Sequence, residues 1–197
     1  MNDLAPSRLA AMIALIVTAI AVAYTAVAAV TGAEMSLGWL IQAIIHVGEL
    51  AAVVALALSG VAGSSRAARL GLGAAMLGQA VLAVAELVWP RNPDLGNTLF
   101  GVGPVLTGLG LVVAGTALVR AGRGTGLPRL LPVIIGTYTL VVLIPIMVGS
   151  GGPPAPAALW AICGWDLLWC LLAASVLTAA RWNAAGEQGA EQLAGFR

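Results

Sequence analysis

Four ionisable residues lie inside stretches of sequence that are otherwise apolar. They are His46, Glu49, Glu86 and Asp166. Placing an ionisable side chain within a membrane helix is costly, and such residues usually face a cavity or a partner and mark a functional site. A carboxyl group withdrawn from water keeps its proton near neutral pH and can give it to a substrate. We therefore expect acid–base catalysis, with these four residues as the catalytic candidates.

The spacing of these residues places aromatic and amide side chains beside them. Steps of three and four residues put side chains on one face of a helix. One such series is Trp39, Gln42, His46 and Glu49, a second is Gln79, Leu82, Glu86 and Trp89, and a third is Asp166, Trp169 and Cys170, flanked by Trp165. Indole faces stabilise a nearby cation. The candidates for substrate binding, which include two tyrosines at compatible depths, are Trp39, Trp89, Trp165, Trp169, Tyr24 and Tyr138.

Several of these residues have an equally simple structural interpretation. Anchoring at the membrane interface is the alternative for the tryptophans nearest the helix ends, which are Trp39, Trp89 and Trp160. His46 also fits a residue that holds helices together by a hydrogen bond to Glu49 or to a backbone carbonyl. Glu86, one turn from its helix end, also fits a side chain that reaches water. Asp166, between two tryptophans, is the hardest to explain in this way.

The composition of the chain requires a membrane protein. Its 197 residues are 60% hydrophobic and only 9% charged, with a mean hydropathy of +1.01, whereas a soluble domain carries about 25% charged residues. Six apolar stretches each exceed the roughly 20 residues that cross a ~30 Å hydrocarbon core: residues 8–30, 37–61, 67–89, 97–119, 130–148 and 157–180. We predict an all-α bundle of six transmembrane helices over residues 1–182, followed by a polar tail at 183–197.

The arginines predict the orientation of this bundle. All nine basic residues are Arg, and eight of them fall on the side that both termini share; Arg91 is the exception. By the positive-inside rule that side is cytoplasmic. The first apolar stretch lacks a small-residue cleavage site and is interpreted as a membrane helix rather than a signal peptide. We expect a multi-pass protein of the cell membrane, with its acids in the outer half and middle of the bilayer.

Residue counts argue against several other kinds of site. A carboxylate metal centre on helices needs a second His-containing motif, and His46 has no second histidine beside it. We therefore expect no metal and no cofactor. The absence of Lys excludes a lysine nucleophile or Schiff base. Cys163 and Cys170 lie about 10 Å apart along a helix, too far for a disulfide, and are interpreted as packing residues.

The fourth apolar stretch is rich in glycine. Gly101, Gly108 and Gly115 recur every seven residues, with Gly103 and Gly110 beside them. Small residues let membrane helices approach closely, so this pattern predicts a central packing helix rather than a ligand-binding loop. Prolines within helices often bend them. Three prolines lie inside predicted helices, and we expect bends at each of them: Pro104, Pro132 and Pro145.

The set of acids and tryptophans resembles two families of small integral-membrane enzymes. Glu49, together with residues 164–169 (GWDLLW), is similar to the acids of membrane-bound terpene cyclases of meroterpenoid and indole-terpenoid pathways, which lack the aspartate-rich motifs of soluble cyclases. His46 beside carboxylates and a Trp is similar to the sterol isomerase-like family. The resemblance implies acid-initiated cyclisation or isomerisation of a terpenoid, with Asp166 as the proton donor and Glu49, oriented by His46, as a second acid or a base. The residues along the carbocation's path would be Trp165, Trp169 and Trp89.

Two further functions fit the same residues. A proton-coupled transporter of small molecules also places titrating carboxyl groups beside aromatics, and its internal repeats would correspond to residues 86–89 and 166–169. An accessory membrane subunit would use the acids only to hold helices together. The expected partners are a lipophilic small molecule and membrane lipids, not nucleic acid; the substrate and the oligomeric state are not readable from the sequence.

Overall fold

The computed structural model of the chain consists of helices and short connections, with no strand in the part that it describes. The backbone is described for residues 4–32, 37–60, 65–122 and 127–194. Side chains are described for residues 6–32, 37–60, 65–122 and 129–179. Six helices in these ranges are long and apolar enough to cross a membrane. The predicted all-α bundle of six transmembrane helices is confirmed.

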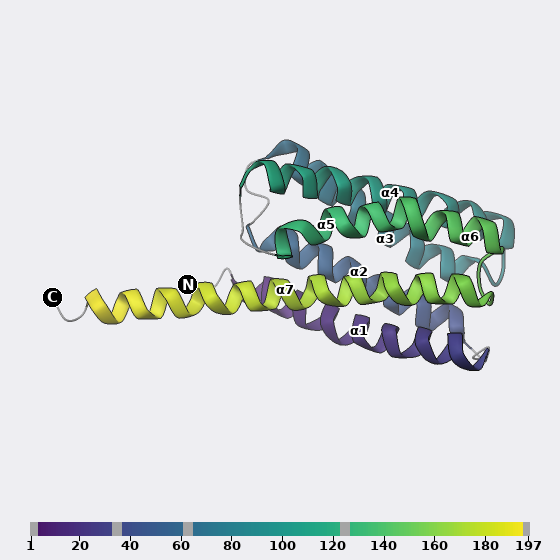
Figure 1. Cartoon of the computed structure of the whole chain (residues 1–197), viewed down its shortest axis with the longest axis horizontal. Coiled ribbons are helices and arrows are strands. Elements are labelled where there is room, and N and C mark those ends of the chain that lie inside the picture. The colour runs from purple at the N-terminus through teal and green to yellow at the C-terminus, as the bar shows by residue number, and fades with distance from the viewer. Residues whose placement is uncertain (1–3, 33–36, 61–64, 123–126, 195–197) are drawn as a thin grey trace.

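The six spans run back and forth along one axis (Figure 1). The first four are α1 (Leu4–Thr31), α2 (Gly38–Leu58), α3 (Arg66–Val88) and α4 (Pro93–Arg120). The fifth consists of α5 (Leu127–Tyr138), the π-helical turn η1 (Thr139–Leu143) and α6 (Ile144–Ser150). The sixth is α7 (Pro156–Ala194). Because the number of spans is even, α1 enters and α7 leaves the bundle at the same end (Figure 1).

The ends of the helices follow from local sequence. The side chain of Ser65 accepts a hydrogen bond from the backbone N–H of Ala68 at the start of α3, at 3.3 Å. Asn92 caps α4 in the same way, and Pro93 follows in the first turn, where a missing N–H costs nothing. The last helix, α7, continues to Ala194. The polar segment that follows residue 182 therefore extends this helix away from the bundle (Figure 1).

Helix α4 lies between α3 and α5 and touches both through glycines. A Cβ atom on Gly71 of α3 would lie 2.6 Å from the carbonyl oxygen of Gly110, so the two backbones are in direct contact. A Cβ atom on Gly136 of α5 would lie 2.6 Å from the carbonyl oxygen of Gly108. The predicted packing role of α4 is confirmed at these positions. It is wrong for Gly101, which is exposed and where an added Cβ atom would meet no atom within 4 Å.

The fifth span departs from regular α-helix just before one of the three prolines. Helices α4 and α5 continue through Pro104 and Pro132. Pro145, by contrast, follows η1, in which the N–H of Ile144 reaches the carbonyl of Thr139, five residues earlier. Proline lacks an N–H, and its ring crowds the carbonyl four residues before it. The wider π turn relieves that crowding, and the sequence analysis did not predict it.

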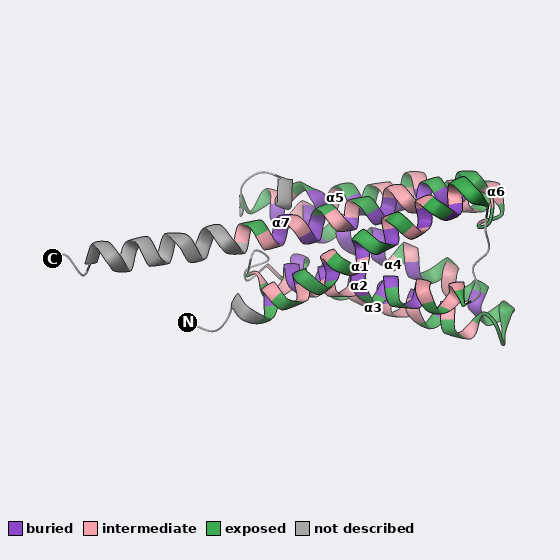
Figure 2. Cartoon of the chain, turned by 90° about the horizontal axis from the view of Figure 1, so that it is seen from below, coloured by how far each residue is buried: buried purple, intermediate pink, exposed green. Residues whose placement is uncertain are grey.

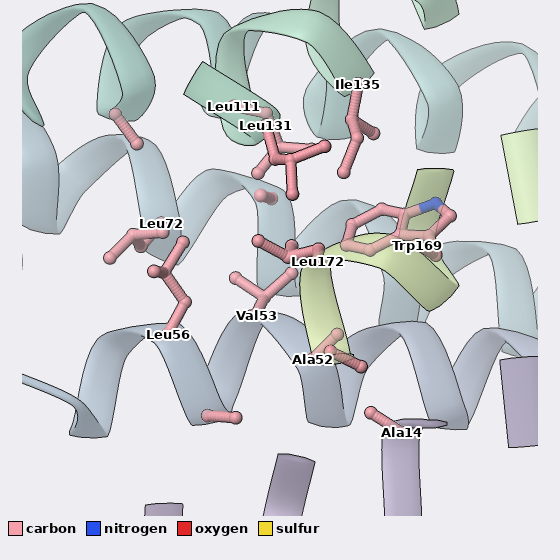
Figure 3. Close-up of a cluster of buried hydrophobic side chains, with 14 of the residues drawn as sticks. Ala14, Ala52, Val53, Leu56, Leu72, Leu111, Leu131, Ile135, Trp169 and Leu172 are labelled. Carbon is pink, nitrogen blue, oxygen red and sulfur yellow. The ribbon is translucent and has the colours of Figure 1, made fainter. Parts of the chain in front are cut away.

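The end of the bundle nearest the start of α1 has a closely packed apolar interior. Side chains from five helices meet there with almost no exposed surface (Figure 3). They are Val53, Leu56, Leu72, Leu111, Leu118, Leu131 and Leu172. We call the part of the bundle that these residues fill the apolar half. The outer faces of the helices are exposed (Figure 2) and also apolar, for example at Leu70 and Val148, as expected for surfaces in contact with lipid.

Candidate functional site

Asp166 lies on α7 in the interior of the bundle and is 1% exposed. The hydroxyl of Thr25, on α1, donates a hydrogen bond to its Oδ2 atom at 2.8 Å. Helices α1 and α7 pack side by side along their length, which is why residues 141 positions apart in sequence meet. The bond fixes one carboxyl oxygen of Asp166 and leaves Oδ1 available to another group.

Glu49 lies on α2, fully buried, and is paired with His46 one turn earlier. The Nδ1 atom of His46 lies 2.8 Å from Oε2 of Glu49. The spacing of three residues predicts this contact, and it forms within α2 rather than between two helices. The second carboxyl oxygen, Oε1, is buried and has no hydrogen-bond partner among the described residues.

Two tryptophans connect the histidine to the neighbouring helices. The rings of His46 and Trp165 meet edge to face, with centroids 6.0 Å apart, and those of Trp165 and Trp169 do the same at 5.9 Å. Trp165 Nε1 donates a hydrogen bond of 2.9 Å to the hydroxyl of Thr139, the first residue of the π turn η1. Both tryptophans are buried inside the bundle.

The four ionisable residues interact with one another electrostatically. Asp166 interacts with both Glu49 and His46, and His46 interacts with Glu86. The structure therefore brings together His46, Glu49, Glu86 and Asp166, which we call the acid cluster. Its members come from α2, α3 and α7, the three helices on which the sequence analysis placed them.

Three other buried polar groups lie among the residues of this region without hydrogen-bond partners in the described chain. Neither amide atom of Gln79 has a partner of good geometry, although the side chain lies beside the His46 ring. The Nε1 atom of Trp169 is also unpaired within the described residues. Buried polar atoms of this kind are rare, and each requires an explanation such as a functional role. With Glu49 Oε1, they offer donors and acceptors from three helices.

Glu86 and Tyr24 lie toward the end of the bundle opposite the start of α1. Glu86 is half-buried, two residues before the end of α3, and interacts with the half-buried Tyr24 of α1. We call this part of the bundle, together with the acid cluster and Thr25, the polar half. Trp39 is half-buried near the same end, at the start of α2.

Three other aromatic residues from the sequence analysis, Trp89, Trp160 and Tyr138, lie outside the group of buried tryptophans. Trp89 and Trp160 are 46% and 53% exposed, and Trp89 packs against Gly96 at the α3–α4 connection. Their positions fit interfacial anchors. Tyr138 is half-buried and its hydroxyl donates a hydrogen bond of 3.0 Å to the carbonyl of Ala161, which ties α5 to α7.

Thr25 and Thr139 are the two site residues that the sequence analysis missed. Each is a hydroxyl residue inside an apolar stretch, a weak signal because Thr commonly bonds to its own helix. Thr139 also does so, donating to the carbonyl of Ile135 at 2.8 Å. Depth was the available signal for Thr25, since α1 and α7 run in opposite directions (Figure 1) and residues 25 and 166 meet across them.

Three members of the acid cluster, His46, Glu49 and Asp166, are buried within the bundle, whereas Glu86 is half-buried. One concavity of 190 Å³ faces outward between α1 and α2 and is lined by apolar side chains, including Val17 and Ile45. A second, of 360 Å³, lies near the start of the fifth span, at Arg120 and Leu130. Neither is lined by a member of the acid cluster, so a substrate would have to pass between helices to reach it.

The described side chains include no group of three His, Cys, Asp or Glu residues that are placed to hold a metal ion. Comparison with known proteins gives no relative from which a role could be transferred. No protein-family model, no curated protein and no solved structure matches the chain. The interpretation of the site therefore depends on its own geometry.

Proposed function

We propose that the chain is a membrane-embedded enzyme that protonates a lipophilic, terpenoid-like substrate and so starts its cyclisation or isomerisation. The observation that carries the proposal is the meeting of two buried carboxyl groups from different helices, Asp166 and Glu49, within electrostatic range of each other. Proton transfer to and from carbon requires an acid and a base held in one site. Their different partners, Thr25 and His46, allow the two groups to take different roles.

Asp166 is the proton donor in this mechanism. Thr25 occupies its Oδ2 atom, so the proton leaves from Oδ1. The O–H bond of Asp166 breaks as a C–H bond forms at one carbon of an alkene, which leaves a carbocation on the substrate and a carboxylate on the protein. Glu49, as carboxylate, takes a proton from a neighbouring carbon, and the electron pair of that C–H bond forms the new double bond. The product is an isomer of the substrate, and a proton returned from Glu49 to Asp166 restores the site.

Trp165 and Trp169 provide the surroundings that a carbocation needs. Their rings lie nearly perpendicular to each other, at 79°, so the two together present faces in more than one direction. An indole face attracts a cation through its quadrupole, and more strongly when the site excludes water. The hydrogen bond from Trp165 to Thr139 holds that ring in place during the reaction.

The test uses the full chain in lipid nanodiscs with a panel of isoprenoid alkenes and epoxides in D₂O. We expect at least one alkene to be converted to an isomer that carries one deuterium on carbon, detected by mass spectrometry. Asp166→Asn and Glu49→Gln should each lower turnover by about 100- to 10,000-fold, the contribution of a general acid or base. Asp94→Asn, which changes an exposed acid at the start of α4, is the control and should retain activity.

Full turnover by folded Asp166→Asn and Glu49→Gln proteins would contradict the proposal, as would conversion of no member of the panel by the unaltered protein. The variants are compared only where size-exclusion profiles and helical content match those of the unaltered chain.

A proton-coupled transporter is the second candidate, and the burial of Glu49 and Asp166 inside membrane-spanning helices favours it. A buried carboxyl group that titrates can exchange its proton for a cationic substrate. Proteoliposomes with an imposed pH gradient separate the two. Solute uptake that depends on the gradient and on Glu49 supports transport, whereas deuterium incorporation without a gradient supports the enzyme.

A further inference from the structure

The ionisable groups of the interior form a series that reaches only one end of the bundle. Glu86 lies near the end of α3 and is half-buried, while Glu49 and Asp166 lie deeper and are almost fully buried. His46 is between them, because it interacts with Glu86 on one side and contacts Glu49 on the other. At 1.5 Å per residue, Glu49 lies about 16 Å along α2 from its first residue. The series thus extends from one surface to near the middle of the membrane.

The apolar half offers no comparable series in the part of the chain that the structure describes. Between the acid cluster and the arginines at the far end, the described side chains include no carboxyl group and no imidazole. The interior there is filled by leucine and valine (Figure 3). Three buried hydroxyls of this half donate to backbone carbonyls. Thr18 and Ser175 donate to their own helices at 2.7 Å, and Ser7 donates to Ala55 of α2 at 3.0 Å. They form no chain along which a proton can move.

We infer that protons reach the acid cluster only from the end of the bundle opposite the start of α1, through Glu86 and His46. Nδ1 of His46 contacts Glu49, which leaves Nε2 as the ring nitrogen that can receive a proton. The side chain of Gln79 lies beside the ring, and Glu86 interacts with it electrostatically. A proton that binds at Nε2 allows the one at Nδ1 to pass to Glu49, so one proton enters the ring as another leaves. The charged or titratable groups that face these two residues are Tyr24, Glu49 and Asp166.

This inference rests on the proposed function for its purpose. Isomerisation returns its proton to the site, so the path serves to exchange that proton with water, which the incorporation of deuterium requires. Its test, however, needs no substrate. Trp165 touches the His46 ring, and a protonated imidazole quenches the fluorescence of a neighbouring indole. The emission of Trp165 therefore reports the arrival of a proton at His46.

The experiment uses the full chain in phosphatidylcholine vesicles, with Phe in place of Trp39, Trp89, Trp160 and Trp182. Trp165 and Trp169 then remain as emitters, and Trp165 is the one that touches His46. The exposed Asn97→Cys site at the polar end reacts with a membrane-impermeant maleimide and gives the fraction of each orientation. A stopped-flow pH drop on the polar-half side should quench emission at least tenfold faster than the same drop on the other side. Glu86→Gln should slow the fast response at least tenfold, whereas Asp94→Asn, at the same end, should leave it unchanged.

Equal rates from the two sides would overturn the inference, and so would an unchanged rate in Glu86→Gln. A quenching signal that persists in His46→Gln would overturn the assignment of His46 as the relay. The outcomes remain separable from those of the proposed function. A one-sided response in a protein that converts no isoprenoid supports the proton path and contradicts the proposed enzymatic function. Deuterium incorporation together with equal rates from both sides supports the enzymatic function and contradicts the proton path.

Discussion

The two halves of the bundle are held together by different interactions. In the apolar half, leucine, valine and alanine side chains fill the interior. The close approach of α3 and α4 begins there, at Gly71 and Gly110, and continues at Gly78 and Gly103. In the polar half, hydrogen bonds link helices that are distant in sequence, as between Thr25 and Asp166 or Trp165 and Thr139. The polar half also holds buried polar atoms that lack partners among the described residues. The densest apolar packing and the residues of the proposed reaction thus lie toward opposite ends of the same helices.

A buried charge in the apolar half should have the largest effect. Leu172 is fully buried among apolar side chains, so Leu172→Asp places a carboxyl group where no partner exists among the described residues. We expect a loss of at least about 3 kcal/mol in the free energy of unfolding, measured by denaturant titration in micelles. The exposed Leu171→Asp variant is the control for the added charge. Comparable stability of Leu172→Asp and the unaltered chain would show that the apolar half is not closely packed.

Substitution at the contact between α3 and α4 should have the next largest effect on stability. Gly110→Ala adds a methyl group 2.6 Å from the carbonyl oxygen of Gly71, and such overpacking costs about 1–3 kcal/mol. Gly101→Ala on the same helix meets no atom within 4 Å and should be neutral or stabilising, because Ala favours helix over Gly by up to about 1 kcal/mol. Thermal unfolding of the two variants compares them directly. A Gly110→Ala protein as stable as Gly101→Ala would contradict the close approach.

The hydrogen bond between α1 and α7 should contribute less. Thr25→Val keeps the shape of the side chain but removes the donor to Asp166, and an unsatisfied buried acceptor costs about 1–3 kcal/mol. If the bond also fixes Oδ2, the variant should lower turnover without changing substrate binding. Thr178→Val, which removes an exposed hydroxyl bonded to its own helix, is the matched control. Equal stability of the two variants would contradict a hydrogen bond between Thr25 and Asp166.

The smallest expected effect is a gain in stability in the polar half. Gln79 buries an amide whose two polar atoms have no partner among the described residues. Replacing it with the similarly shaped Met should raise the free energy of unfolding by about 1 kcal/mol, while lowering activity if the amide holds substrate. A destabilised Gln79→Met protein would show that the amide is satisfied in the membrane. Gln42→Met, at a half-buried position of α2, provides the comparison.

Much of the architecture could be predicted because it depends on local sequence. Apolar length defines each span, and a spacing of three residues defines the contact of His46 with Glu49. The partner of Asp166 could not be predicted, since Thr25 meets it only because α1 packs beside α7, and periodicity does not say which helices are neighbours. For the same reason the glycine repeat predicted a packing helix but misplaced Gly101, whose face of α4 is exposed. The side of the membrane on which each end lies stays a prediction from the arginines.

The π turn at Thr139–Leu143 gives the fifth span one residue more than a regular helix of the same length would hold. A single deletion within the turn would let the span continue as unbroken α-helix without shortening the distance it covers. In a regular α-helix such a deletion would turn the following segment by about 100°, whereas the π turn absorbs the extra residue and lets the segments on its two sides keep their faces. The deletion would therefore act within the turn itself, which begins at Thr139, the residue that accepts the hydrogen bond of Trp165. The fifth span can gain or lose one residue here without a change in how the rest of it packs.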